Sequence, residues 1–320
     1  MQISYWPLLA AVAPVFFIIL TGFIIRRIGW LTREADHSLL RVCVNVLMPC
    51  LILDSVLGNP ALSKIENVTL PPLIGFSTFL IGYLVALPAG RLLRLNENQA
   101  RTFSFTVGSY NYAYIPLPLV LAFCPRETTG VLFTHNLGVE IAFWTAGIGV
   151  LTGSSLRNGW TKIFNPPVFA LLGALLLNAC HGAEWLPGFM LKSAHITGQS
   201  AVPLSLILTG ATLADLLRHT WPRLTGATPA CAIFLRMALL PLLSLLLAKY
   251  LPCSIELKRI IVIQAAMPAA MLPIVISKHF GGDATTALQV VISTSLVGLL
   301  TIPFWIRLGF LFTGITLGGH

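Results

Sequence analysis

Two apolar segments of this chain, residues 107–118 and 262–273, combine prolines with polar side chains that can bind a ligand. Proline inside a helix removes an N–H donor and clashes with the carbonyl four residues back, so each segment is predicted to break or kink a helix. Amide and hydroxyl groups at a break can bind the freed backbone groups or a ligand. The predicted binding residues are Asn111, Tyr112, Gln264 and Met267, and the helix-breaking prolines are Pro116, Pro118, Pro268 and Pro273.

The two segments correspond to each other when the second is shifted by 155 residues. A second pair of motifs, shifted by 154 residues, supports this internal repeat: Asn45 precedes Pro49 by four residues, as Gln199 precedes Pro203. Each proline removes the partner of a carbonyl that belongs to an amide residue. We therefore predict further helix breaks at Pro49 and Pro203, with Asn45 and Gln199 as further binding residues. Paired interruptions in two repeats indicate the binding site of a transporter.

A carboxylate inside an apolar segment is the most costly feature of the chain, because an ionised acid at the centre of a span costs about 2.5–3.5 kcal/mol. Glu140 shares one helical stripe with Asn136 and Trp144, and His135 lies beside that stripe. A buried carboxylate and an imidazole suit proton coupling, so Glu140, His135 and Asn136 are predicted coupling residues. The alternatives are a structural hydrogen bond or a salt bridge from Glu140 to Arg236, which can itself contact an anion.

The composition shows which elements must position these residues. The 320-residue chain is 56% hydrophobic and 10% charged, with a mean hydropathy of +0.84, whereas soluble domains carry about a quarter charged residues. Each of its apolar stretches is long enough to cross about 30 Å of hydrocarbon. We predict an all-α integral membrane protein with ten transmembrane helices, at 6–28, 36–57, 71–93, 102–123, 129–152, 166–184, 193–215, 228–250, 258–279 and 285–310.

Five spans in each half place the halves, residues 1–152 and 153–320, in opposite orientations, as two inverted five-helix repeats. The broken spans 4 and 9 then run antiparallel and cross near the middle of the membrane. Each broken span offers a half-helix N-terminus, which carries about half a positive charge and favours an anionic ligand. The alternative is that these prolines only kink packed helices.

The basic residues lie mainly in short loops, so the net charge of +9 does not indicate nucleic-acid binding. Twelve of the 20 lysines and arginines lie in or beside the loops on one side of the membrane, and seven lie on the other. By the positive-inside rule both termini are expected outside the cytoplasm. A cleaved signal peptide is not expected, since Met1–Pro7 lacks a basic region. The six scattered cysteines predict neither a metal site nor a disulfide.

Three stretches carry a resemblance to a known family. They are Ala13–Phe16 through Thr21–Gly22 with Asn45–Pro49, Asn111–Pro118, and Met267–Ala270 followed by Gly281–Asp283, Ser293, Thr294, Thr301–Pro303 and Trp305. By these stretches the chain resembles the auxin efflux carrier family of secondary transporters, bacterial type, within the superfamily of bile acid, arsenite and riboflavin transporters. In place of the family's usual glycines the chain has Ala113 and Pro116, and three tyrosines crowd that break.

The resemblance implies a carrier of small organic anions that works by an elevator-like movement of a crossover domain against a scaffold, the two domains being interleaved between the repeats. Plant relatives move indole-3-acetate, and bacterial relatives are associated with dicarboxylates. The resemblance also implies substrate contact at Asn111, a homodimer formed through the scaffold, and a place in the bacterial inner membrane.

Other functions predict other features. A sodium-coupled symporter of the bile-acid type has the same repeat logic, and Thr197, Gln199 and Ser200 offer oxygen ligands for Na+. A passive channel predicts flux without saturation or counterflow. An enzyme is not expected, because the chain contains no HExxH, Gly-x-Ser-x-Gly or Walker A motif. No cofactor is expected, and coupling to H+ or to Na+ stays open.

Overall fold

A computed structural model describes residues 5–153, 160–180, 182–220 and 224–316. Within these ranges the chain is helical, with one isolated antiparallel bridge and no strand, which confirms the all-α prediction. The α-helices are α1 (Tyr5–Arg27), α2 (Arg33–Val42), α3 (Met48–Val56), α4 (Glu66–Leu92), α5 (Glu97–Gly108), α6 (Pro116–Phe123), α7 (Arg126–Ala142), α8 (Ile148–Thr152), α9 (Trp160–Ile163), α10 (Pro166–Ala179), α11 (Gly188–Gln199), α12 (Ala201–Thr220), α13 (Ala227–Phe234), α14 (Leu240–Tyr250), α15 (Ile255–Ala265), α16 (Leu272–His279) and α17 (Ala284–Thr313). Shorter turns are η1 (Cys43–Leu47), η2 (Pro60–Ser63), η3 (Phe143–Gly147), η5 (Gly182–Trp185) and η7 (Leu235–Leu239).

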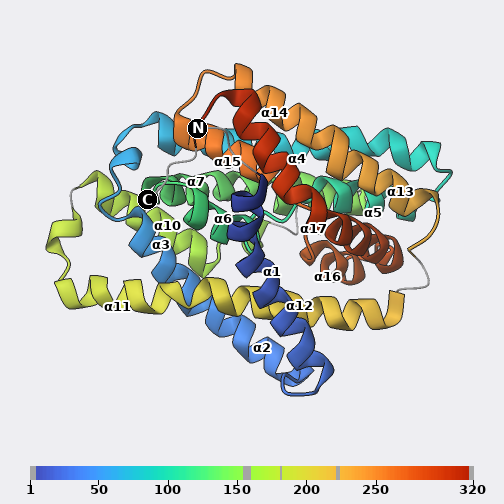
Figure 1. Ribbon diagram of the computed structural model, residues 1–320, viewed down its shortest axis with the longest axis horizontal. Coiled ribbons are helices and arrows are strands. Elements are labelled where there is room, and N and C mark those ends of the chain that lie inside the picture. The colour runs from blue at the N-terminus through green and yellow to red at the C-terminus, as the bar shows by residue number, and fades with distance from the viewer. Residues whose placement is uncertain (1–4, 154–159, 181, 221–223, 317–320) are drawn as a thin grey trace.

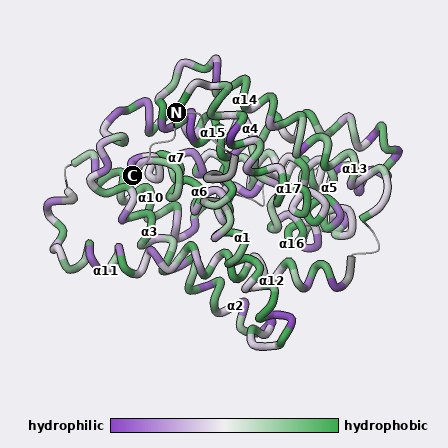
Figure 2. Tube along the Cα trace, viewed as in Figure 1, coloured by the Kyte–Doolittle hydropathy of each residue, from purple (hydrophilic) through white to green (hydrophobic). Residues whose placement is uncertain are grey.

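Five helical runs in the described residues are long and apolar enough to cross a membrane. They are Arg33–Val56, Glu66–Leu92, Gly188–Arg218, Ala227–Tyr250 and Ala284–Thr313. Apolar residues cover most of the helices, while hydrophilic residues gather at loops such as those between α1 and α2 and between α4 and α5 (Figure 2). The arrangement of ten spans stays a prediction.

Two interruptions divide helical segments where the sequence predicts breaks. α5 ends at Gly108 and α6 begins at Pro116, while α15 ends at Ala265 and α16 begins at Leu272. Local caps fix where these helices start: Asn96 and Gln99 form a capping box at α5, and the Ser254 side chain accepts from the Leu257 N–H at α15. Capping side chains close in the sequence therefore fix the N-termini of the two helices that lead into the breaks.

The predicted breaks at Pro49 and Pro203 look different. At Pro49 the helix is not broken: η1 is a π-helical turn that passes directly into α3, so the prediction is wrong there. The wider π turn accommodates a missing N–H without ending the helix. Near Pro203, Ser200 alone separates α11 from α12, and the two continue as one long apolar run.

Glycines bring two pairs of helices into close contact. A Cβ on Gly138 of α7 would lie 1.8 Å from the Pro72 carbonyl oxygen of α4, and a Cβ on Gly210 of α12 would lie 1.8 Å from the Ile19 oxygen of α1. Small residues at such contacts let helix backbones approach within a membrane. In Figure 1, α11 and α12 cross the lower part of the molecule above α2, and α14 lies near the top, with α6 and α7 between them.

Candidate functional site

The two interrupted segments meet. Tyr110 and Ala269 form an antiparallel bridge, in which the Asn111 N–H donates to the Pro268 oxygen at 2.8 Å and the Ala270 N–H donates to the Ser109 oxygen at 2.7 Å. Backbone groups that have left a helix need partners inside a membrane. Each break therefore supplies partners for the other, and the two segments run antiparallel where they touch.

Side-chain amides satisfy the carbonyl that Pro116 leaves without a donor. That carbonyl belongs to Tyr112, four residues back, and it accepts from Asn136 Nδ2 and from Gln264 Nε2, each at 3.0 Å. Gln264 Nε2 also lies 3.3 Å from Asn136 Oδ1. A break in the first half of the chain is thus stabilised by α7 and by α15 of the second half.

Glu140 accepts one hydrogen bond from the first helix break and one from its own helical stripe. The Tyr112 hydroxyl donates to Glu140 Oε1 at 2.7 Å, and Trp144 Nε1 donates to Oε2 at 2.9 Å. Among the described residues no salt bridge joins Glu140 to Arg236, whose Nε instead donates to the Met267 carbonyl at 2.9 Å. The salt-bridge alternative is therefore wrong, and the structural hydrogen bonds are present. His135 contacts Asn136 at 3.4 Å rather than the carboxylate.

Asn111 acts on its own backbone in this structure. Its Oδ1 accepts from the N–H groups of Tyr114 at 3.1 Å and of Ile115 at 3.4 Å, just before α6 begins, and the residue is 6% exposed. Asparagine side chains commonly order a turn in this way. A contact between Asn111 and substrate stays a prediction.

The turn gives a testable expectation for Asn111. We expect Asn111→Ala to destabilise the protein by about 0.5–1.5 kcal/mol, the usual net contribution of a hydrogen bond, because the turn before α6 loses its side-chain acceptor. Thermal unfolding of purified protein in detergent measures this. Asn111→Asp keeps the acceptor and should lose less; equal stability of wild type and Asn111→Ala would contradict the assigned role.

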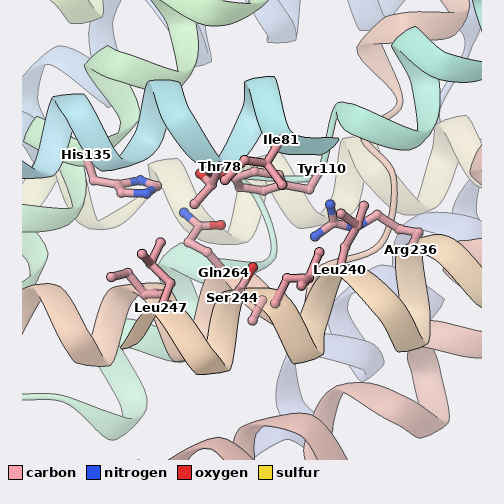
Figure 3. Close-up of a pocket in the computed structure, with 12 residues that line it drawn as sticks. Thr78, Ile81, Tyr110, His135, Arg236, Leu240, Ser244, Leu247 and Gln264 are labelled. Atoms are coloured by element: carbon pink, nitrogen blue, oxygen red, sulfur yellow. Dashed lines mark hydrogen bonds between the residues drawn. The ribbon is translucent and has the colours of Figure 1, made fainter. Parts of the chain in front are cut away.

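A cavity of about 240 Å³ lies between α4, α14 and α15, beside the paired breaks. Figure 3 shows His135 and Arg236 at opposite ends of it, with Gln264 and Ser244 between them. Its polar lining residues are Thr78, Tyr110, His135, Arg236, Ser244 and Gln264. Apolar side chains, including Leu240, Leu247 and Ile261, complete the wall.

Arg236 is the principal charge in this wall. It is 3% exposed, lies in η7 and stacks over the Tyr110 ring at 5.0 Å from guanidinium carbon to ring centre. Its Nε is used by the Met267 carbonyl, and in the described part of the chain no carboxylate pairs with the guanidinium. The remaining N–H groups suit a planar anion such as a carboxylate, which they can bind in bidentate fashion.

Not every predicted binding residue reaches this cavity. Asn45 and Gln199 are exposed, and Gln199 Nε2 lies 2.8 Å from His195 Nε2. Tyr112 donates its hydroxyl to Glu140 and does not line the cavity, whereas Tyr110 does. Met267 is buried, and its backbone carbonyl accepts a hydrogen bond from Arg236 Nε.

The amino-acid sequence of the chain matches a known protein family. A family model described as "membrane transport protein" matches residues 7–158 and 155–306. The chain belongs to this membrane transport protein family. The resemblance to the auxin efflux carriers is thereby confirmed, and the apolar helices agree with a multi-pass membrane protein.

Two relatives in this family are similar over almost their whole length. An uncharacterized transporter of Methanothermobacter thermautotrophicus is 25% identical over 298 residues, covering 92% of this chain and 96% of the relative. An uncharacterized transporter of Methanocaldococcus jannaschii is 21% identical over 298 residues, covering 91% and 95%.

Proposed function

We propose that this member of the membrane transport protein family is a secondary active transporter of small organic anions. The observation that carries the proposal is Arg236, a buried guanidinium without a carboxylate partner among the described residues, on a cavity beside the paired helix breaks. A charge at membrane depth is costly and marks a substrate or ion pathway by default. A carboxylate substrate would supply the missing counter-charge.

The proposed transport mechanism includes a domain that moves relative to the rest of the protein. Paired breaks at the contact between two inverted repeats are the place where such transporters bind substrate near the bilayer midplane. We infer that ten spans form a crossover domain and a scaffold, that the crossover domain moves as an elevator, and that two copies associate through the scaffold. Both termini would face away from the cytoplasm across the plasma membrane.

The test is counterflow. A thermal-shift screen of mono- and dicarboxylates, indole acids and bile acids identifies an acid that stabilises the purified protein. Proteoliposomes preloaded with that acid should then accumulate its radiolabelled form against its gradient, and uptake should saturate. Flux without saturation or counterflow would indicate a channel and contradict a carrier. Paired assays with and without Na+ distinguish sodium coupling from the proton-coupled alternative.

Coupling through Glu140 gives a separate prediction. We expect Glu140→Gln to flatten the pH dependence of uptake, because glutamine keeps a hydrogen-bonding side chain towards Tyr112 and Trp144 but cannot exchange a proton. Initial uptake rates across a series of external pH values measure this. Glu256→Gln, at a half-buried position in the first turn of α15 and outside the cavity lining, is the matched control and should keep the wild-type profile. An unchanged profile in Glu140→Gln would assign the carboxylate to structure.

A further inference from the structure

One carbonyl fixes the direction of two amides beside the cavity. The Tyr112 oxygen can only accept, so the amide atoms that contact it, Asn136 Nδ2 and Gln264 Nε2, are the donors of their side chains. Gln264 Nε2 also faces Asn136 Oδ1, an acceptor, which agrees with the same assignment. Gln264 Oε1 is consequently an acceptor, and this buried atom has no hydrogen-bond partner among the described residues.

The same logic extends to His135. Its Nδ1 lies 3.4 Å from Asn136 Oδ1, an acceptor, so Nδ1 carries the hydrogen. In the neutral imidazole Nε2 is then the acceptor, and it too is buried without a partner in the part of the chain that the structure describes. His135 is 1% exposed and Gln264 is 4% exposed, and both line the cavity.

The cavity is therefore polarised. Arg236 offers N–H donors at one end and His135 Nε2 is an acceptor without a donor at the other, while Gln264, with the second such acceptor, and Ser244 lie between them (Figure 3). Buried polar groups are normally hydrogen-bonded, and an acceptor left without a donor is unfavourable. A bound molecule that satisfies both ends needs an anionic group for Arg236 and an O–H or N–H donor for His135 Nε2.

We propose that the cavity selects elongated monocarboxylates that carry a hydroxyl or N–H group at the end opposite the carboxylate. This inference rests on the proposed function and names its substrate class. It also excludes a class: a dicarboxylate dianion would place its second charge against the acceptor Nε2 of His135.

The wall sets the shape of the body. Leu240, Leu243, Ser244 and Leu247 line the cavity along one face of α14, a distance of about 10 Å at 1.5 Å per residue. An apolar body one aromatic ring long, with the two polar groups in para positions, fits between the two ends. 4-Hydroxyphenylacetate has this form.

Calorimetric titration of the full-length protein in detergent at neutral pH compares three acids of one skeleton. We expect 4-hydroxyphenylacetate to bind about tenfold more tightly than phenylacetate, because the parent acid leaves His135 Nε2 unpaired. We expect 4-carboxyphenylacetate, a dianion, to bind at least about tenfold more weakly than the hydroxy acid. Equal affinities, or tightest binding of the dianion, would overturn the inference and leave the proposed function standing.

Variants locate the preference. His135→Phe should reduce the affinity ratio of hydroxy acid to parent acid to about threefold or less, whereas His279→Phe, at an exposed position outside the cavity lining, should keep the wild-type ratio. A wild-type ratio in folded His135→Phe would contradict the assigned acceptor. Failure of all three acids to bind a monodisperse wild-type protein would overturn the inference, whereas only the absence of binding and counterflow across the whole acid panel would contradict the proposed function.

Discussion

Replacing Arg236 by glutamine is expected to weaken carboxylate binding by about 30-fold or more, because truncating one partner of a buried, hydrogen-bonded charge pair costs about 2–5 kcal/mol. The guanidinium is buried, and in the described residues no carboxylate competes for it. The substrate anion would therefore be its counter-charge. Titration of the stabilising acid into purified Arg236→Gln protein measures the loss.

A second buried arginine provides a matched control. Arg259 of α15 is 7% exposed and donates from Nη2 to the Thr316 carbonyl at 3.1 Å, but it does not line the cavity. We expect Arg259→Gln to keep wild-type affinity. Arg236→Lys should bind with intermediate affinity, since an ammonium keeps the charge but loses the bidentate geometry.

The opposite result would relocate the site. Wild-type affinity in folded Arg236→Gln would show that Arg236 is held only by the Met267 carbonyl and the Tyr110 ring. The anion would then bind elsewhere, and the half-helix N-termini at the breaks would be the remaining candidates.

The sequence predicts the interruptions before Pro116 and around Pro268 because their cause is local. Proline removes one identified N–H, so the broken carbonyl can be named in advance, and Tyr112 of the first break is such a residue. The internal repeat further predicts that the two breaks correspond. What it cannot predict is the donor that replaces the missing N–H, because Gln264 reaches Tyr112 across 152 positions of the chain.

The remaining errors have the same origin. Glu140 and Arg236 are natural partners by charge, but a stripe position cannot say whether two helices bring them together, and in the structure each binds a nearer group. Tyr110, Tyr112 and Tyr114 occupy every second position of the first break. This spacing indicates that their side chains face different ways, but it does not tell which one faces the cavity. At Pro49 a π-helical turn is found where a break is predicted. Whether the backbone breaks or forms a π turn depends on packing as well as on the proline.

The close contact between α4 and α7 gives the second large prediction. A Cβ on Gly138 would lie 1.8 Å from the Pro72 oxygen and 2.5 Å from the Pro72 carbonyl carbon, both backbone atoms that cannot rotate away. We expect Gly138→Ala to destabilise the protein by about 3 kcal/mol or more, at or above the upper end of the usual overpacking cost. Thermal unfolding and size-exclusion profiles in detergent measure the loss.

Gly173 is the matched control, because it also lies inside an apolar helix, α10, but a Cβ there would meet no atom within 4 Å. Alanine is favoured over glycine in a helix by about 1 kcal/mol, so Gly173→Ala should keep or raise stability. If Gly138→Ala were as stable as Gly173→Ala, the two backbones could not be in the contact that the structure gives.

This contact also links stability to the cavity. A Cβ on Gly75 of α4 would lie 2.2 Å from the His135 oxygen, and the Gly75 carbonyl accepts from the Thr78 hydroxyl at 3.1 Å. Thr78 and His135 both line the cavity, so the glycine contact fixes their separation. A Gly138→Ala protein that still folds must separate α4 from α7. It should then lose the preference for a hydroxy acid along with its stability.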